Sequence, residues 1–115
     1  MAEIRMVDTR AMDFSEDTRF PGIGVKVLEG KATHPALSMV VVRVEPGRGI
    51  PTHTHSVETE TAYLLAGTAI LTVEGVEHRW EAEVSVTIPP GLAHSLRNAG
   101  DVALEIVAVH SPGTR

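Results

Sequence analysis

The stretch PTHTHSVETE, residues 51–60, places two histidines one residue apart and follows them with two glutamates. If His53 and His55 lie on a β-strand, their imidazoles point to the same face, because alternate residues of a strand share a face. Glu60 comes five residues after His55, which leaves room for a bend and a return on the adjoining strand. Two imidazoles and a carboxylate that face one point form a site for a borderline divalent metal. Without a metal, burying these three polar groups would carry a heavy desolvation cost.

A fourth ligand is expected at His94, which follows a turn signal. The residues before it, 88–93, read IPPGLA, and their Pro-Pro-Gly sequence reverses the chain into a new strand. Glu58 competes with Glu60 for the role of the carboxylate, but the spacing favours Glu60 and leaves Glu58 as a solvated loop residue. The remaining histidines are expected to be solvated imidazoles on the surface: His34, His78 and His110.

The rest of the chain is built from short apolar segments that end at glycine or proline. Segments 36–44 (ALSMVVVRV) and 68–73 (TAILTV) are rich in β-branched residues, which favour strands. Glu74 and Gly75 are typical of a hairpin tip in which the glycine adopts a positive φ. Short strands separated by turn signals at intervals of about eight to twelve residues are typical of a β-sandwich or barrel. The sequence therefore predicts an all-β fold.

Alternation along the strand that begins near Glu60 predicts which side chains enter the interior. Glu60, Ala62 and Leu64 should point inward. Thr61 and Tyr63 should point outward, against a second sheet or a partner. An interior lined by small apolar side chains would suit a small, partly apolar ligand.

Composition and charge exclude several classes of protein. The chain has 115 residues, which fits one domain, and 43% of them are hydrophobic, enough for a packed core. A formal net charge of −5 argues against binding to nucleic acid, since phosphate contacts need clustered Lys and Arg. The chain has no cysteine, so nitrogen and oxygen would have to hold any metal. No apolar run approaches membrane-spanning length, and the acidic N-terminus does not read as a signal peptide, so a cytoplasmic location is expected.

Three segments are predicted along the chain. Residues 1–19 are mixed and polar, and they are interpreted as an N-terminal arm that forms a short helical turn or an extended segment. Residues 20–110 contain the predicted strands and form the barrel domain. Residues 111–115, SPGTR, are expected to be a loose C-terminal tail.

Two spaced motifs resemble those of the cupin superfamily, specifically its small single-domain members. The first motif places a glycine, a His-X-His pair, a glutamate and a second glycine at fixed intervals. This sequence matches that motif with Gly47, His53, His55, Glu60 and Gly67.

The second motif begins with a glycine and continues with Pro-X-Gly, a histidine and an asparagine. Pro89, Gly91, His94 and Asn98 match at the required spacings, whereas Glu83 stands in place of the leading glycine. The turn there is therefore expected to differ in shape, although no ligand is lost. Asn98 has two interpretations: it bonds to the metal shell or a substrate, or it caps the turn that follows it.

The resemblance implies a double-stranded β-helix, the jelly-roll cupin barrel, with a metal near one open end. It implies that the metal ligands are His53, His55, Glu60 and His94. It also implies a homodimer, in which an N-terminal strand such as GVKVLEG, residues 24–30, adds to the sheet of the partner.

Three imidazoles and one carboxylate suit several divalent transition metals, namely Fe, Mn, Ni, Cu, Co and Zn. The preferred interpretation is a metal-dependent, dioxygenase-like enzyme acting on a small oxygenated organic molecule such as a dicarbonyl, an enol or a phenolic acid. Metal-dependent decarboxylation or isomerisation, with the ion as Lewis acid, stays open. A non-catalytic module that binds or senses a small ligand through the metal stays open as well.

Overall fold

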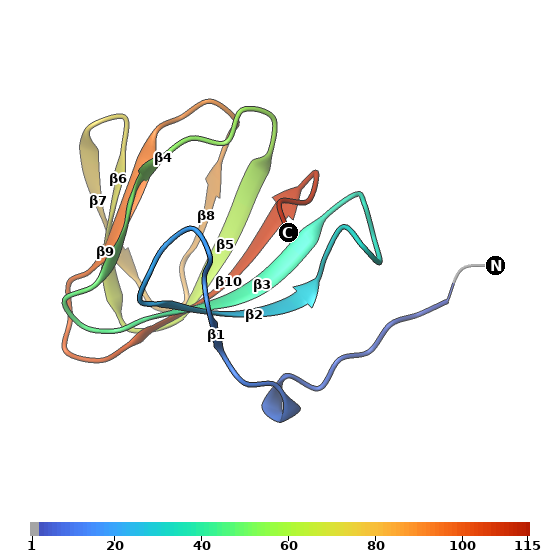
Figure 1. Ribbon diagram of the computed structural model, residues 1–115. Coiled ribbons are helices and arrows are strands. Elements are labelled where there is room, and N and C mark those ends of the chain that lie inside the picture. Colours follow the sequence, from blue (N-terminus) through green and yellow to red (C-terminus); the bar gives the residue numbers. More distant parts are fainter. Residues whose placement is uncertain (1–2) are drawn as a thin grey trace.

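The computed structural model describes residues 3–115, so Met1 and Ala2 of the predicted arm lie outside the described residues. These residues form ten β-strands in two antiparallel sheets, which face each other (Figure 1). The larger sheet has the strand order β1-β2-β3-β10-β5-β8, and the smaller has the order β4-β9-β6-β7. The fold is an all-β double-stranded β-helix, or jelly roll, and the predicted fold class is confirmed.

The strands of the larger sheet are β1 (Ser15–Glu16), β2 (Ile23–Glu29), β3 (Ser38–Val44), β5 (Thr59–Ala66), β8 (Ser85–Ile88) and β10 (Leu104–Ser111). The strands of the smaller sheet are β4 (Gly49–His53), β6 (Thr68–Val73), β7 (Val76–Glu81) and β9 (His94–Asn98). The helical structure within residues 3–115 consists of a single 3₁₀ turn, Thr9–Ala11. Within residues 3–115, no helix has the length and apolar character that crossing a membrane requires.

The core lies between the two sheets and is made of aliphatic side chains. Val40, Val42 and Val44 of β3 are buried at alternate positions, as are Leu104 and Ile106 of the adjacent β10. Each of these strands therefore turns one face to the interior, because alternate side chains of a strand share a face. The β-branched residues that predicted the strands are thus also the residues that fill the core.

The predicted alternation along β5 is confirmed. Ala62 and Leu64 are buried, whereas Thr61 and Tyr63 are exposed on the outer face of the larger sheet. Glu60 belongs to the inward-facing set and is partly buried, with an 18% exposed side chain. The alternation of side chains along β5 therefore places the Glu60 carboxylate in the interior.

Two turns contain residues with a positive φ. Glu74 and Gly75 form the tip of the β6–β7 hairpin with φ values of 49° and 79°, as predicted. Glu83 stands where the resemblance would place a glycine, and its φ is 68°. The turn before β8 therefore contains the left-handed backbone conformation that favours glycine, with a glutamate adopting it.

The N-terminal part of the larger sheet is built from β1 and β2. The segment that was expected to join a partner's sheet forms β2, which lies between β1 and β3 of its own chain. β1 pairs with β2 only at Gly24 and Val25, so the rest of this β2 edge has no partner strand within residues 3–115, and its addition to a partner's sheet stays a prediction. Of the predicted arm, residues 1–19, the structure shows residues 3–14 as extended apart from the 3₁₀ turn, whereas Ser15–Glu16 pair with β2 in the larger sheet (Figure 1).

The C-terminal residues are not a loose tail, so that expectation is wrong. Thr114 N–H donates a hydrogen bond to Ser38 Oγ at 3.0 Å, and Lys31 N–H donates to the carbonyl oxygen of Arg115 at 2.8 Å. The Arg115 guanidinium binds the buried carboxylate of Asp17 at 2.9 Å. These contacts hold the C-terminus against the body of the barrel, beside the segment that follows β1.

Candidate metal centre

Two of the predicted ligands face each other across a strand pair of the smaller sheet. His53 ends β4 and His94 begins β9, and the two residues are direct partners in the ladder. Their ring centroids lie 4.2 Å apart. His53 Nδ1 and His94 Nδ1 each lie 2.9 Å from a backbone carbonyl oxygen, those of Pro51 and Leu92. A carbonyl only accepts, so each Nδ1 carries the proton and each Nε2 presents a lone pair to the interior.

His55 reaches the same point from a loop. It was expected to share a strand with His53, but β4 ends at His53, so this expectation is wrong. The loop is held by a hydrogen bond of 2.8 Å from Gly91 N–H to the carbonyl oxygen of His55. The Pro-Pro-Gly turn that precedes His94 therefore also fixes the backbone of His55. The ring centroids of His55 and His94 lie 5.4 Å apart.

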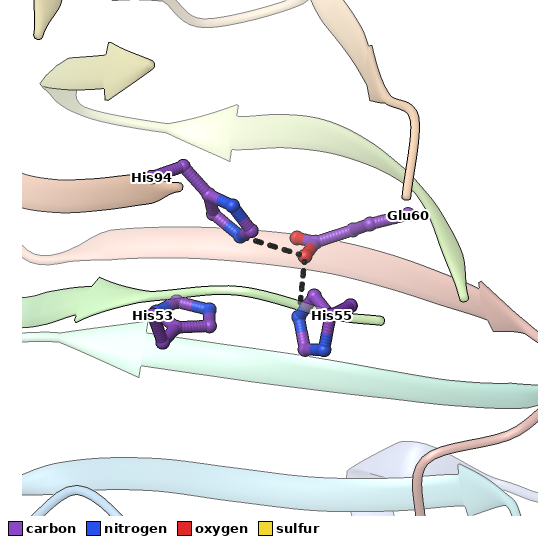
Figure 2. Close-up of side chains that lie close together, drawn as sticks. All are labelled: His53, His55, Glu60 and His94. Atoms are coloured by element: carbon purple, nitrogen blue, oxygen red, sulfur yellow. Dashed lines mark ion pairs between the residues drawn. The ribbon is translucent and has the colours of Figure 1, made fainter. Parts of the chain in front are cut away.

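Glu60 supplies the carboxylate from the opposite sheet. Its Oε1 lies 3.4 Å from His55 Nε2 and 3.5 Å from His94 Nε2 (Figure 2). The same oxygen lies 3.1 Å from Nε2 of a further histidine, His110. Burial by itself raises the pKa of Glu60, but the contacts with His110, His55 and His94 outweigh it and hold this pKa well below the usual range. The carboxyl group is therefore ionised at neutral pH.

The histidines respond to this environment in opposite ways. Burial lowers the pKa of His53 below its ordinary value and outweighs the hydrogen bond to Pro51. Burial also acts to lower the pKa of His94, but the contact with Glu60 and the bond to Leu92 outweigh it, so the pKa is raised. A neutral His53 and an ionised Glu60 are in the protonation states that metal binding requires.

All four predicted ligands come together in the structure. One ligand atom from each of His53, His55, Glu60 and His94 can be chosen so that all lie within 4.8 Å of one another. Ligand atoms about 2.0–2.2 Å from a common ion fall within such a distance. Three nitrogen donors and one oxygen donor, drawn from both sheets (Figure 2), fit a divalent transition metal. The predicted metal is therefore supported, whereas its identity is left open by this donor set.

His110 was expected to be a surface imidazole at the start of the tail, and this is wrong. The residue is 5% exposed and lies on β10 directly opposite Glu60 of β5. The signal that could have placed it is the alternation of β10, where Leu104, Ile106 and Ala108 are buried on the same face. Continuing that alternation by one step brings His110 into the interior.

The cluster opens into a pocket between the sheets. The cavity that a water-sized molecule can reach inside it is about 60 Å³. Most of the wall is apolar, with Trp80, Ile106 and Phe20 among the lining side chains. Phe20 packs on His53, with ring centroids 5.3 Å apart, and the Arg19 guanidinium lies 5.1 Å above the Phe20 ring. A small molecule in this pocket would meet apolar walls and the four-residue cluster at the same time.

The remaining predicted residues are placed as follows. Glu58 is partly buried, and its Oε2 accepts from Val57 N–H at 3.4 Å, within its own loop. Asn98 is buried and accepts a hydrogen bond from Gly100 N–H at 2.9 Å, which confirms the turn-capping interpretation. His34 and His78 are exposed, as expected.

Comparison with known proteins identifies the family. The model of the cupin domain matches residues 40–110, which include both motifs and the whole cluster. The chain belongs to the cupin family. Among solved structures, this cupin is similar to a predicted oxalate decarboxylase from Thermotoga maritima, with a TM-score of 0.85 and 23% identity. The alignment covers 94% of this chain and 99% of the other, which supports the jelly-roll fold.

The chain is also similar in sequence to three proteins of different description. Protein SchB of Streptomyces halstedii is 32% identical over 99 residues, which cover 84% of this chain and 72% of SchB. The tetracenomycin polyketide synthase protein TcmJ of Streptomyces glaucescens is 28% identical over 71 residues, or 62% of this chain and 48% of TcmJ. A mannose-1-phosphate guanylyltransferase of Salmonella montevideo is 39% identical over 70 residues. That match covers 61% of this chain but spans only 15% of the guanylyltransferase.

Proposed function

We propose that this cupin is a metal-dependent, dioxygenase-like enzyme that acts on a small oxygenated organic molecule. The proposal is carried by one observation: three imidazoles and an ionised carboxylate lie in the wall of a largely apolar pocket. The metal would be held by His53, His55, Glu60 and His94. A six-coordinate ion with four protein ligands would supply two further positions, for a substrate oxygen and for dioxygen or water.

The side chains around the cluster would position the substrate and keep water out. Trp80 is 3% exposed, and its indole N–H donates to the carbonyl oxygen of Val84 at 2.8 Å, so it turns only its apolar face to the pocket. Phe20 covers His53 on another side. Arg19, whose side chain is 43% exposed, would meet a polar or anionic end of the substrate. These contacts favour a compact molecule with an apolar body and a few oxygen atoms.

The name of one relative supports the same class of substrate. TcmJ is described as a protein of the tetracenomycin polyketide synthase. Polyketide chains carry repeated carbonyl and enol oxygens, which are the groups that chelate a divalent metal. Enols, dicarbonyls and phenolic acids are therefore the first substrates to test.

A non-catalytic small-ligand binding or sensing module is the second candidate, and a specific observation favours it. Among the described residues that line the pocket, the ionisable groups outside the cluster already have charged or polar partners. Asp17 binds Arg115 and lies 3.8 Å from Arg19, and His110 contacts Glu60. The carboxylate of Asp17, which lines the pocket outside the cluster, is already paired with arginines, so binding without turnover is consistent with this pocket.

The test begins with elemental analysis of tag-free protein beside the His53→Ala variant. We expect a near-stoichiometric transition metal in the wild type and little in the variant. Oxygen uptake is then measured with enols, dicarbonyls and phenolic acids, and the His53→Ala variant treated with the same metal is the control. Metal-dependent oxygen consumption supports the dioxygenase. Product formation without oxygen consumption would assign a decarboxylase or isomerase, and tight binding without turnover would assign the binding module.

We also propose that the chain assembles as a homodimer. The outer face of the larger sheet carries a row of apolar side chains at Val41, Val107 and Tyr63, which are cross-strand neighbours. Such a face is favourable to cover with a second copy of the same surface. The absence of nucleic-acid partners and the cytoplasmic location stay predictions from the sequence.

A further inference from the structure

His110 is the one histidine in contact with the cluster that the four-ligand set leaves without a role. It lies on β10, which runs between β3 and β5 near the centre of the larger sheet. Antiparallel pairing places its Cα directly opposite that of Glu60. The register of the β5–β10 pair therefore places the two side chains next to each other.

The hydrogen bonding of His110 is the reverse of that of His53 and His94. In those two residues Nδ1 donates to a backbone carbonyl and Nε2 faces the cluster with a lone pair. In His110, Nε2 lies 3.1 Å from Glu60 Oε1. An ionised carboxylate only accepts hydrogen bonds, so Nε2 of His110 carries the proton and donates it. A nitrogen that donates this bond is not free to bind a metal.

Glu60 is also the one polar partner of His110 within the described residues. The His110 side chain is 7% exposed, and its Nδ1 is buried with no hydrogen-bond partner in residues 3–115. The ring packs edge-on against His55, with centroids 4.9 Å apart. The orientation of the ring is therefore set by its packing and by the bond to Glu60.

We propose that His110 is a positioning residue, which holds the Glu60 carboxylate in its metal-binding orientation through an Nε2–H hydrogen bond. The inference rests on the proposed metal centre and adds a residue outside its ligand set. Without this donor, a carboxylate on a flexible side chain would lose a hydrogen bond that it keeps in a largely buried site. Groups that orient metal ligands in this way typically contribute about 10- to 100-fold to metal affinity.

A matched pair of variants separates the hydrogen bond from the space that the ring fills. His110→Gln can place an amide N–H near the position of Nε2, whereas His110→Met has a similar length but no donor. His78→Met, on the exposed part of β7, is the control for a histidine away from the cluster. The Zn²⁺ affinity of each metal-free protein is measured by competition with a chromophoric chelator, after thermal unfolding shows that it is folded.

We expect His110→Met to bind Zn²⁺ about 10- to 100-fold more weakly than wild type. His110→Gln should recover most of this loss, and His78→Met should bind like wild type. Equal affinity of His110→Met and wild type would overturn the proposal, as would equal losses in the Gln and Met variants. If His110→Met does not fold, His110→Phe, which keeps a ring but has no donor, takes its place with the same expected loss.

A second readout distinguishes a positioning residue from a fifth ligand. Pulsed EPR of the Cu²⁺-loaded protein counts the imidazoles bound to the ion. We expect the same number in wild type and in His110→Gln. A loss of one imidazole in the variant would make His110 a ligand and overturn the proposal. A wild type that binds no metal would overturn both this inference and the proposed function, whereas bound metal without turnover would affect the proposed function alone.

Discussion

At the scale of single residues, position in the fold separates histidines that look alike in the sequence. His53 and His78 both lie on strands of the smaller sheet, β4 and β7. His53 belongs to the four-residue cluster, whereas His78 is exposed on the β6–β7 hairpin. We expect His53→Ala to lose most of the bound metal and His78→Ala to retain it, measured as metal per chain in tag-free protein. Equal retention in the two variants would remove His53 from the ligand set.

The candidate site could be predicted from the sequence as far as the motif extends. The spacing of the four cluster residues is a local property of two short stretches, and the structure brings all four together. His110 was missed because it was assigned to a tail rather than to the strand whose alternation it continues. The contact between Asp17 and Arg115 joins residues 98 positions apart, and no local pattern indicates it.

At the scale of secondary structure, the ends of strands depend on their partners. β4 and β9 pair as far as His53 and His94, and the ladder has a register shift just before that pair. A local sequence cannot show where a partner strand begins, so the sequence placed His55 on the strand and the structure places it in the loop. The strand segments themselves were predictable, because β-branched runs and turn residues are local signals.

The close approach of β4 and β9 depends on a residue without a side chain. A Cβ on Gly49 would meet the backbone carbonyl oxygen of Leu96 on β9. Gly49→Ala should therefore push apart the two strands that carry His53 and His94, and lower the free energy of unfolding by about 1–3 kcal/mol. Its Zn²⁺ affinity should fall as well. Urea unfolding and chelator competition measure both effects.

The control for this change is Gly100→Ala, because the nearest atom to a Cβ there lies 3.7 Å away. We expect Gly100→Ala to keep wild-type stability and metal affinity. A Gly49→Ala variant as stable as Gly100→Ala would show that β4 can shift without cost.

The segment after β1 and the C-terminus are joined by a buried ion pair at the pocket. The Asp17 side chain is 1% exposed, and its carboxylate accepts hydrogen bonds from Arg115 Nη2 at 2.9 Å and from Arg19 N–H at 2.8 Å. Asp17→Asn should lower the free energy of unfolding by about 1–3 kcal/mol, because it removes a charged acceptor from buried donors. Urea unfolding at pH 7 checks this, with Asp101→Asn in an exposed loop as control.

The same pair predicts a dependence on pH. Burial raises the pKa of Asp17, but the hydrogen bonds from Arg19 N–H and Arg115 outweigh it and hold this pKa below its usual value. A pKa that is lower in the folded state contributes stability above the unfolded pKa, about 3.9, and loses it as the pH falls through the folded value. The stability difference between wild type and Asp17→Asn should therefore be largest near neutral pH and shrink below about pH 4. A constant difference down to pH 2 would contradict this account.

At the scale of the whole molecule, the cluster depends on both sheets at once. The smaller sheet and its loop supply the three imidazoles of the set, and the larger sheet supplies Glu60 with His110 behind it. The two halves of the site therefore meet only when the sheets pack through the core. Metal binding and folding should be coupled for this reason, since a metal that binds only the folded state stabilises that state.

The outer faces of the two sheets differ in character, and this difference predicts how the molecule assembles. The outer face of the smaller sheet is mostly polar: Ile70 lies between Arg79 and Arg97 in the ladder, Thr72 follows on β6, and Glu77 and Arg97 lie 3.8 Å apart. The outer face of the larger sheet presents the row Val41, Val107 and Tyr63, and Tyr63 is 40% exposed. A twofold dimer would bring this row against the same row of a second copy, so that each covers the apolar surface of the other.

Tyr63→Lys places a charge at one end of that row without entering the core, so it should convert a wild-type dimer into a folded monomer. Thr72→Lys adds the same charge to the outer face of the smaller sheet and should stay dimeric. Light scattering coupled to gel filtration gives the mass of each protein across a range of concentrations, and circular dichroism checks the fold. A wild type that is monomeric throughout, or a Tyr63→Lys variant that remains a dimer, would exclude this face as the interface. Because Tyr63 points away from the pocket and Glu60 points into it from the same strand, the monomeric variant should still bind metal.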